Sequence, residues 1–206
     1  MSPEQLLTSI PLVPLLAAFG VVAARANPNL REGISIGAGV ILFLLVAALA
    51  ATIDWGAPPT LVIATPVAGL SLSLTPEPLG MLFALVASLL WPITTVYAVG
   101  YMRAHHEQNE TRFYTAFAAS ISAAMCIALA GNMLTLFVFY EVLSVATYPL
   151  VTHAGTDKAR RAGRVYLGLL MGTSIGFLLL AMIWTWLLTG TLDFTPGGVF
   201  DDQVSG

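Results

Sequence analysis

Glu141 is the residue of this chain whose placement points most directly to chemistry. It lies near the middle of an apolar run, Gly131 to His153, which contains no other acidic or basic side chain before His153. As a helix rising about 1.5 Å per residue, this run would be roughly 33 Å long, enough to cross a bilayer. An ionised carboxylate at mid-depth costs on the order of 3 kcal/mol or more, and the usual reason to keep one is ion or proton handling. Glu141 is therefore the candidate proton-carrying group.

Three further polar side chains share the helical face of Glu141. Ser144, Tyr148 and Thr152 follow it at offsets of three, seven and eleven residues, which place them on one face at 100° per residue. The continuation of this face on the other side of Glu141 is apolar. Such a stripe resembles a half-channel, and it predicts that Ser144 and Tyr148 hydrate or orient a proton relay at Glu141. The alternative is a carboxyl group that is protonated, or hydrogen-bonded, only to hold helices together.

The predicted membrane-spanning segments offer Glu141 no cation. The only lysine, Lys158, falls in a connecting segment, and none of the spans contains arginine. His153 is about 18 Å along the same helix by rise alone. Because a buried carboxylate without a counter-charge is costly, the sequence predicts that another membrane subunit supplies intramembrane lysines to complete the site.

The elements that must position Glu141 are membrane helices. Hydrophobic residues make up 57% of the chain, charged residues only 9%, and the mean hydropathy is +0.85, well outside the range of soluble domains. The fold class is therefore an all-α membrane protein with six predicted transmembrane helices. The segments are Leu6–Ala24, Ile34–Ile53, Leu79–Met102, Tyr114–Ala130, Asn132–His153 and Val165–Thr189.

The basic residues predict the orientation of these six helices. All eight fall in alternate connections between the predicted spans, and the positive-inside rule assigns those connections to the cytoplasm. Both termini are then expected outside. The basic residues are Arg25, Arg31, Arg103, Arg112, Lys158, Arg160, Arg161 and Arg164.

The remaining segments predict packing and local structure rather than chemistry. Gly168, Gly172 and Gly176 repeat at every fourth residue, a pattern that lets membrane helices approach closely, either toward the fifth helix or toward an external subunit. The Val67–Leu74 stretch predicts a short extramembrane strand or hairpin between helices two and three. The chain divides into residues 1–78 with the first two helices and the outer link, 79–194 with helices three to six, and 195–206, a loose outer tail.

Other functional signatures are missing from the sequence. It contains no phosphate-binding loop, dinucleotide fingerprint, Cys-x-x-Cys pair or nucleophile elbow. We therefore expect no cofactor, no metal and no catalytic residue within this chain. The basic connections are too short for nucleic-acid binding. The chain is an enzyme component only if it forms part of a proton-translocating oxidoreductase.

The sequence contains two sets of short motifs. The first set is Tyr97–Met102, Arg112–Tyr114, Gly131–Phe137 and Phe139–Ser144, and the second is Ser144–Thr152, Ala159–Gly168 and Thr189–Phe194. The first set resembles the N-terminal half of the antiporter-like subunits, the proton-translocating membrane subunits shared by respiratory NADH:quinone oxidoreductase and Mrp-type multisubunit cation/proton antiporters. The second set most resembles the D-type subunit of the Mrp antiporters. The resemblance is strong from Gly80 to Phe194 and weak over the first two helices.

The resemblance implies that Glu141 is the carboxylate of the family's proton pathway. It also implies that Glu141 works with lysines on later helices, including the seventh, and with a second, inverted repeat. Members of the family usually have about fourteen helices, whereas six are predicted here. Glu77 also stands where many members have aspartate before Pro-Leu. The sequence leaves two explanations open: a short or split subunit that sits beside a second polypeptide, or a truncated product without transport of its own.

The function expected from the sequence is that of a multi-pass subunit of a multisubunit cation/proton antiporter, or of a related proton-pumping complex, in a bacterial inner membrane. Its partners are the lipid bilayer and other membrane subunits, and its transported ions are protons, with sodium as a candidate. A structural or assembly subunit without transport is the rival from another class. A self-contained carrier acting as a homo-oligomer is a third alternative, disfavoured by the missing cation.

Overall fold

The computed structural model describes residues 1–67, 69–195 and 198–200. Helices dominate, and one two-stranded sheet interrupts them. The elements in chain order are α1 Pro3–Ala23, α2 Pro28–Thr52, β1 Leu61–Val67, β2 Leu70–Leu74, α3 Pro78–His105, α4 Glu110–Ala128, α5 Met133–Val151, α6 Asp157–Thr173, the π-helical segment η1 Ser174–Leu179, and α7 Leu180–Thr189.

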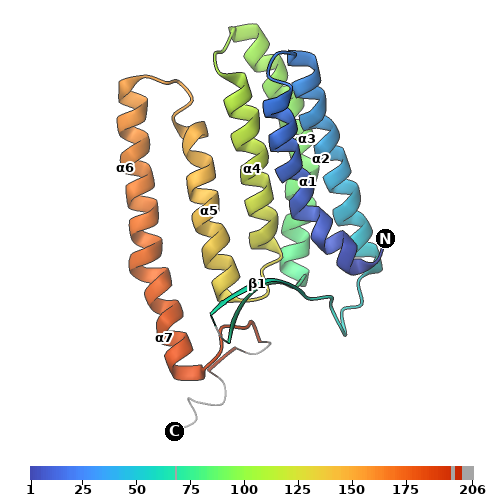
Figure 1. The fold of residues 1–206 in the computed structure, drawn as a ribbon, viewed down its shortest axis with the longest axis vertical. Helices are drawn as coiled ribbons and strands as arrows, with labels where there is room; N and C mark the ends of the chain where they lie inside the picture. Colours follow the sequence, from blue (N-terminus) through green and yellow to red (C-terminus); the bar gives the residue numbers. More distant parts are fainter. Residues whose placement is uncertain (68, 196–197, 201–206) are drawn as a thin grey trace.

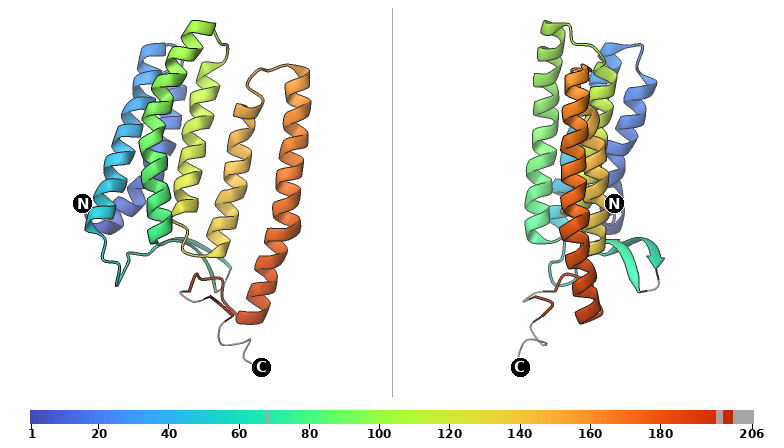
Figure 2. Two further views of the ribbon diagram at one scale, coloured as in Figure 1. Left: turned by 180° about the vertical axis from the view of Figure 1, so that it is seen from behind. Right: turned by 90° about the vertical axis from the view of Figure 1, so that its left-hand side faces the viewer.

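The helices run up and down in one bundle, with α6, η1 and α7 forming one continuous helical rod. Helices α1 to α4 form a compact group, α5 packs against α4, and the rod lies at the edge beside α5 (Figures 1 and 2). The N-terminus, the β-hairpin and the segment after α7 gather at one end of the bundle, which we call the hairpin end. The connections α1–α2, α3–α4 and α5–α6 lie at the other end, the basic end.

Within the described residues, five helical units are long and apolar enough to cross a membrane: α1, α2, α3, α5 and the α6–α7 rod, which spans Asp157–Thr189. The sixth predicted span, α4, is helical but falls outside this group. It carries Glu110 and Arg112 in its first turn and is rich in small and hydroxyl side chains. These features reflect its central position, because α4 lies between α1, α3 and α5 (Figure 1).

The helices extend further toward the basic end than the sequence predicted. The α6 helix begins at Asp157 rather than at Val165, and α2 begins at Pro28 rather than at Ile34. Arg31, Arg103 and Arg112 therefore lie within terminal helical turns, not in loops. Hydropathy missed these turns because their charged residues fold as helix once they are capped, as Thr156 caps α6 by accepting from the Ala159 N–H at 3.1 Å.

Close backbone approaches hold the first four helices together. A Cβ added at Gly39 of α2 would meet the ring of Pro92 in α3 at 2.9 Å, and one added at Gly80 of α3 would overlap the Ala128 carbonyl oxygen. Ser122 of α4 donates to the Pro11 carbonyl of α1 at 2.7 Å. Small residues at these contacts allow membrane helices to pack tightly and to share backbone hydrogen bonds.

The hairpin predicted between helices two and three is confirmed, and it begins earlier, at Leu61. Strands β1 and β2 pair antiparallel, with Leu61 opposite Leu74. Asn132 joins this hairpin to the start of α5: its side chain caps the helix by accepting from the Thr135 N–H at 2.8 Å and donates to the Ser71 carbonyl at 2.8 Å. These hydrogen bonds of Asn132 fix the start of α5, the helix that carries Glu141.

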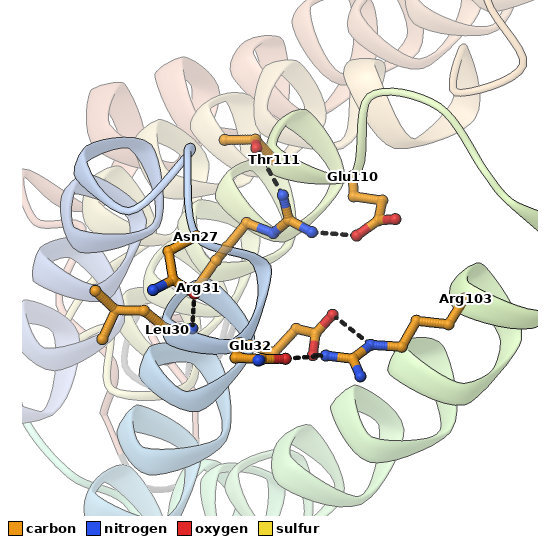
Figure 3. A network of polar contacts seen from close by, with 8 residues as sticks. Asn27, Leu30, Arg31, Glu32, Arg103, Glu110 and Thr111 are labelled. Atoms are coloured by element: carbon orange, nitrogen blue, oxygen red, sulfur yellow. Dashed lines mark hydrogen bonds and ion pairs between the residues drawn. The ribbon is translucent and has the colours of Figure 1, made fainter.

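Two ion pairs join α2, α3 and α4 at the basic end (Figure 3). Arg31 pairs with Glu110 and also donates to Thr111 Oγ1 at 3.1 Å. Glu32 pairs with Arg103, whose Nε lies 3.1 Å from Glu32 Oε1. Arg31 and Glu32 are each 5% exposed, so these charges depend on their partners for stabilisation.

Candidate functional site

Glu141 lies two turns into α5 and faces the α6–α7 rod. Its Oε1 atom accepts a hydrogen bond from the hydroxyl of Ser174, the first residue of η1. Its Oε2 atom is buried and has no hydrogen-bond partner within the described ranges. Within the described residues the carboxyl group is therefore held at Oε1, while Oε2 is open to a counter-charge or to a further hydrogen bond.

Two further residues of the predicted polar stripe, Tyr148 and Thr152, also face the rod. A Cβ added at Gly163 of α6 would overlap the Thr152 methyl carbon and meet the Tyr148 ring at 3.2 Å. Glu141, Tyr148 and Thr152 thus lie on the side of α5 that contacts α6 and η1. These three residues share one face of α5, as the helical period predicted. Their role in a proton relay stays a prediction.

Ser144 and Thr152 are buried within this stripe, but their hydroxyls bond to their own helix. Ser144 donates to the Tyr140 carbonyl and Thr152 to the Tyr148 carbonyl, each at 2.9 Å. Serine and threonine in helix interiors commonly bond in this way. The residue that directly contacts the carboxyl group is Ser174, from the rod.

The predicted glycine ridge does not pack against α5. A Cβ added at Gly168, Gly172 or Gly176 would meet nothing within 4 Å. The close contact between α5 and α6 lies instead at Gly163, which the sequence did not single out. An antiparallel pairing rule could have found it, because residues equally distant from a tight turn lie at the same depth, and this rule pairs Thr152 with Gly163 and Glu141 with Ser174.

Gly163→Ala is expected to lower the free energy of unfolding by about 1–3 kcal/mol, because the added methyl group overlaps Thr152. Gly168→Ala is the matched control on the same helix: its new methyl group meets open space and raises helix propensity, with an expected gain of up to about 1 kcal/mol. Denaturant unfolding of the two variants in mixed micelles measures the difference. Equal stabilities would contradict the packing described here.

Arg112 fixes the other end of α5. Its guanidinium group donates to the Thr152 carbonyl at 3.2 Å and to the His153 carbonyl at 3.0 Å, which are orphan acceptors at a helix C-terminus. The His153 ring lies close to Glu107, with Nε2 3.9 Å from Oε2. The end of the polar stripe is thus held by α4 and by the connection that precedes it.

Glu141 has no cationic neighbour within salt-bridge distance in the part of the chain that the structure describes. The ion pairs in this part lie at the basic end and involve other residues. The carboxyl group consequently depends on the Ser174 hydroxyl alone for a direct partner. One neutral hydrogen bond is a weak substitute for a counter-charge at a buried carboxylate.

Comparison with known proteins defines the class to which this architecture is related. Residues 130–199, which include α5 and the α6–α7 rod, match the family described as NADH:quinone oxidoreductase/Mrp antiporter, TM. Over these residues the chain is similar to that family. The resemblance that its motifs indicate is confirmed.

Two curated relatives match nearly the whole chain. NAD(P)H-quinone oxidoreductase subunit 5, organellar chromatophore 1, of Paulinella chromatophora is 27% identical over 92% of this chain. The putative antiporter subunit mnhD2 of Staphylococcus saprophyticus is 26% identical over 89% of it. The matches cover only 30% and 36% of these relatives, so the chain spans about a third of their length.

A solved structure shows the same fold. The Mrp complex from Dietzia sp. DQ12-45-1b contains a chain that superposes with a TM-score of 0.73 at 23% identity, over 94% of this chain and 36% of that one. At this identity the likeness concerns the fold. The arrangement of α1 to α7 with an intervening hairpin is therefore one already used in a multisubunit membrane complex.

Proposed function

We propose that this chain is a membrane subunit, or the part of one, that contributes the proton-relay carboxyl group Glu141 to a multisubunit cation/proton antiporter or related proton-pumping complex. The observation that carries the proposal is the carboxyl group of Glu141: Ser174 holds its Oε1 atom, and its buried Oε2 atom has no hydrogen-bond partner among the described residues. Ionisable groups kept within membrane helices typically mark ion or proton pathways.

In this proposal all six helices cross the membrane, α4 included, because it is as long as α5 and lies inside the bundle. The basic end faces the cytoplasm by the positive-inside rule, and both termini and the hairpin face outward. A bacterial inner membrane fits this arrangement. Protons reach Glu141 from the cytoplasmic side along the α5–α6 contact, where Ser144 and Tyr148 line the approach.

The proposal requires a cation from beyond the described residues. A lysine on a partner helix could approach the free Oε2 atom of Glu141 and stabilise its ionised form. The rod leaves room for such a partner: Leu169, Phe177 and Leu180 are 66%, 76% and 61% exposed, and the ridge formed by Gly168, Gly172 and Gly176 is open. We propose that this ridge packs against the partner helices.

Mild solubilisation of native membranes, followed by mass spectrometry of the co-purifying proteins, tests this requirement. We expect at least one co-purifying partner with lysines inside predicted membrane spans. In a second experiment, cysteines introduced at Gly168 or Gly172 are expected to cross-link to this partner. The lipid-facing control is a cysteine at Val40 of α2, which is 46% exposed. Recovery of the chain alone, or only with copies of itself, would contradict the proposal.

The rival function is a structural or assembly subunit without transport. The extensive ion-pair and hairpin contacts among α1 to α5 would suit such a role. The two functions differ at Glu141: the structural one predicts that replacing it changes assembly or nothing, whereas the relay predicts assembly without proton-coupled transport.

A further inference from the structure

The hydroxyl of Ser174 has two acceptors and only one hydrogen to donate. Its oxygen lies within hydrogen-bond distance of Glu141 Oε1 and also 3.0 Å from the Met171 carbonyl oxygen in its own helix. A serine hydroxyl supplies one donor and two lone pairs. The hydrogen can point at only one of these acceptors at a time, and protonation of Glu141 at Oε1 turns it from the carboxyl group to the Met171 carbonyl.

Each state of Glu141 has its own complete pattern of hydrogen bonds. When Glu141 is ionised, it can only accept, so Ser174 donates to the carboxylate. When Glu141 is protonated on Oε1, its O–H donates to the Ser174 oxygen, and the Ser174 hydrogen turns to the Met171 carbonyl. The second state therefore differs from the first by one added proton on Oε1: the bond between Ser174 and Glu141 reverses its direction, and a bond from Ser174 to the Met171 carbonyl forms.

The backbone is irregular at the same residue. Ser174 begins the π-helical segment η1, which lies between two α-helical stretches of one rod. It is the one residue of η1 that is buried. Single π-helical turns within α-helices are rare and occur frequently at functional sites. Ser174 lies at the junction of α6 and η1, where its backbone N–H also bonds to the Leu170 and Met171 carbonyls.

We propose that Ser174 is a positioning residue whose hydroxyl changes partner between Glu141 and the Met171 carbonyl, so that the η1 segment senses the protonation of Glu141. This inference rests on the proposed function, since it assigns a control element to the same carboxyl group. It also gives a direct way for the rod, which carries the open glycine ridge, to respond to the proton.

Ser174→Ala in the intact assembly is the test, measured as the rate of cation-induced collapse of a proton gradient in everted membrane vesicles at a series of pH values. Without the donor, the ionised form of Glu141 loses its hydrogen bond. The pH of half-maximal transport is then expected to rise by up to about one unit, because Ser174 bonds with both forms of Glu141 and the bond to the ionised form is the stronger one. Ser174→Thr keeps the hydroxyl and is expected to restore the original profile.

Thr173→Ala is the matched control, because the Thr173 hydroxyl donates only to the Leu169 and Leu170 carbonyls, each at 2.9 Å. Its pH profile is expected to match the unmodified chain. If Ser174→Ala assembles poorly, Ser174→Cys keeps the volume with a weaker donor and is expected to move the midpoint part of the way. An unchanged midpoint in Ser174→Ala or in Ser174→Cys, or a lower rate without a shift, would overturn the inference.

The outcome for Glu141→Gln separates this inference from the proposed function. If Glu141→Gln is inactive while Ser174→Ala keeps the original pH profile, the relay stands and only the role of Ser174 fails. If Glu141→Gln transports normally, the relay itself fails.

Discussion

Replacing Glu141 with Gln is expected to reduce proton-coupled transport by at least about 100-fold while the complex still assembles. The amide fits the same space and can accept from Ser174 at its oxygen, but it cannot take up and release a proton. The loss of a positioned acid–base group typically costs a factor of this size. Collapse of a proton gradient in everted vesicles measures transport, and native gel electrophoresis of the solubilised complex measures assembly.

Glu77→Gln is the matched control for this experiment. Glu77 precedes α3 at the hairpin end, is exposed, and makes no side-chain capping bond. Removal of its charge is expected to leave transport within about twofold, since an exposed carboxylate away from the pathway contributes little. Normal transport in Glu141→Gln, or loss of assembly in that variant alone, would support the structural rival instead.

Arg31→Ala is expected to lower the free energy of unfolding by about 2–4 kcal/mol. The arginine is 5% exposed, pairs with Glu110, and lies 5.6 Å from the ring of Tyr114. Its removal leaves Glu110 without its partner, and breaking one side of a buried pair typically costs about 3–5 kcal/mol. The lower bound reflects the partial exposure of Glu110, whose side chain is 21% accessible. Denaturant unfolding in mixed micelles measures the loss.

The double variant Arg31→Met with Glu110→Met distinguishes the cost of an unpaired buried charge from the loss of the ion pair itself. Replacing both partners by apolar side chains removes the uncompensated charge, so the double variant is expected to be more stable than Arg31→Ala. Arg25→Ala, at an exposed turn after α1, is expected to change stability by less than about 0.5 kcal/mol. Equal losses in Arg25→Ala and Arg31→Ala would show that the buried ion pair of Figure 3 does not stabilise the fold.

The sequence predicted the features that follow from hydropathy and helical period. Long apolar runs indicated the helices, the Val67–Leu74 stretch indicated the hairpin, and the motifs around Glu141 indicated the family relationship. The period of 3.6 residues also placed Glu141 and Tyr148 on one face of α5. These signals are local. They predict the structure well because the backbone groups of a membrane-spanning helix must form their hydrogen bonds within that helix.

Contacts between helices were harder to predict, because they depend on relative depth and rotation. The regular spacing of Gly168, Gly172 and Gly176 suggested a contact, yet the close approach lies at Gly163. The π-helical segment η1 also changes the register of the rod, and no sequence pattern predicted this segment. Charged helix ends were missed for a third reason: hydropathy excludes Arg31 and Arg103 from a span, although ion pairs hold them in helical turns.

Infrared difference spectroscopy can show whether the carboxyl group of Glu141 takes up and releases a proton. The purified complex in lipid nanodiscs would be titrated between acid and alkaline pH, and the carbonyl stretch of a protonated carboxylic acid would be followed in the unmodified chain and in Glu141→Gln. The relay predicts a band that appears and disappears reversibly with pH and is missing from Glu141→Gln. Spectra identical in the two proteins at every pH would show that Glu141 does not exchange protons, and would contradict the account.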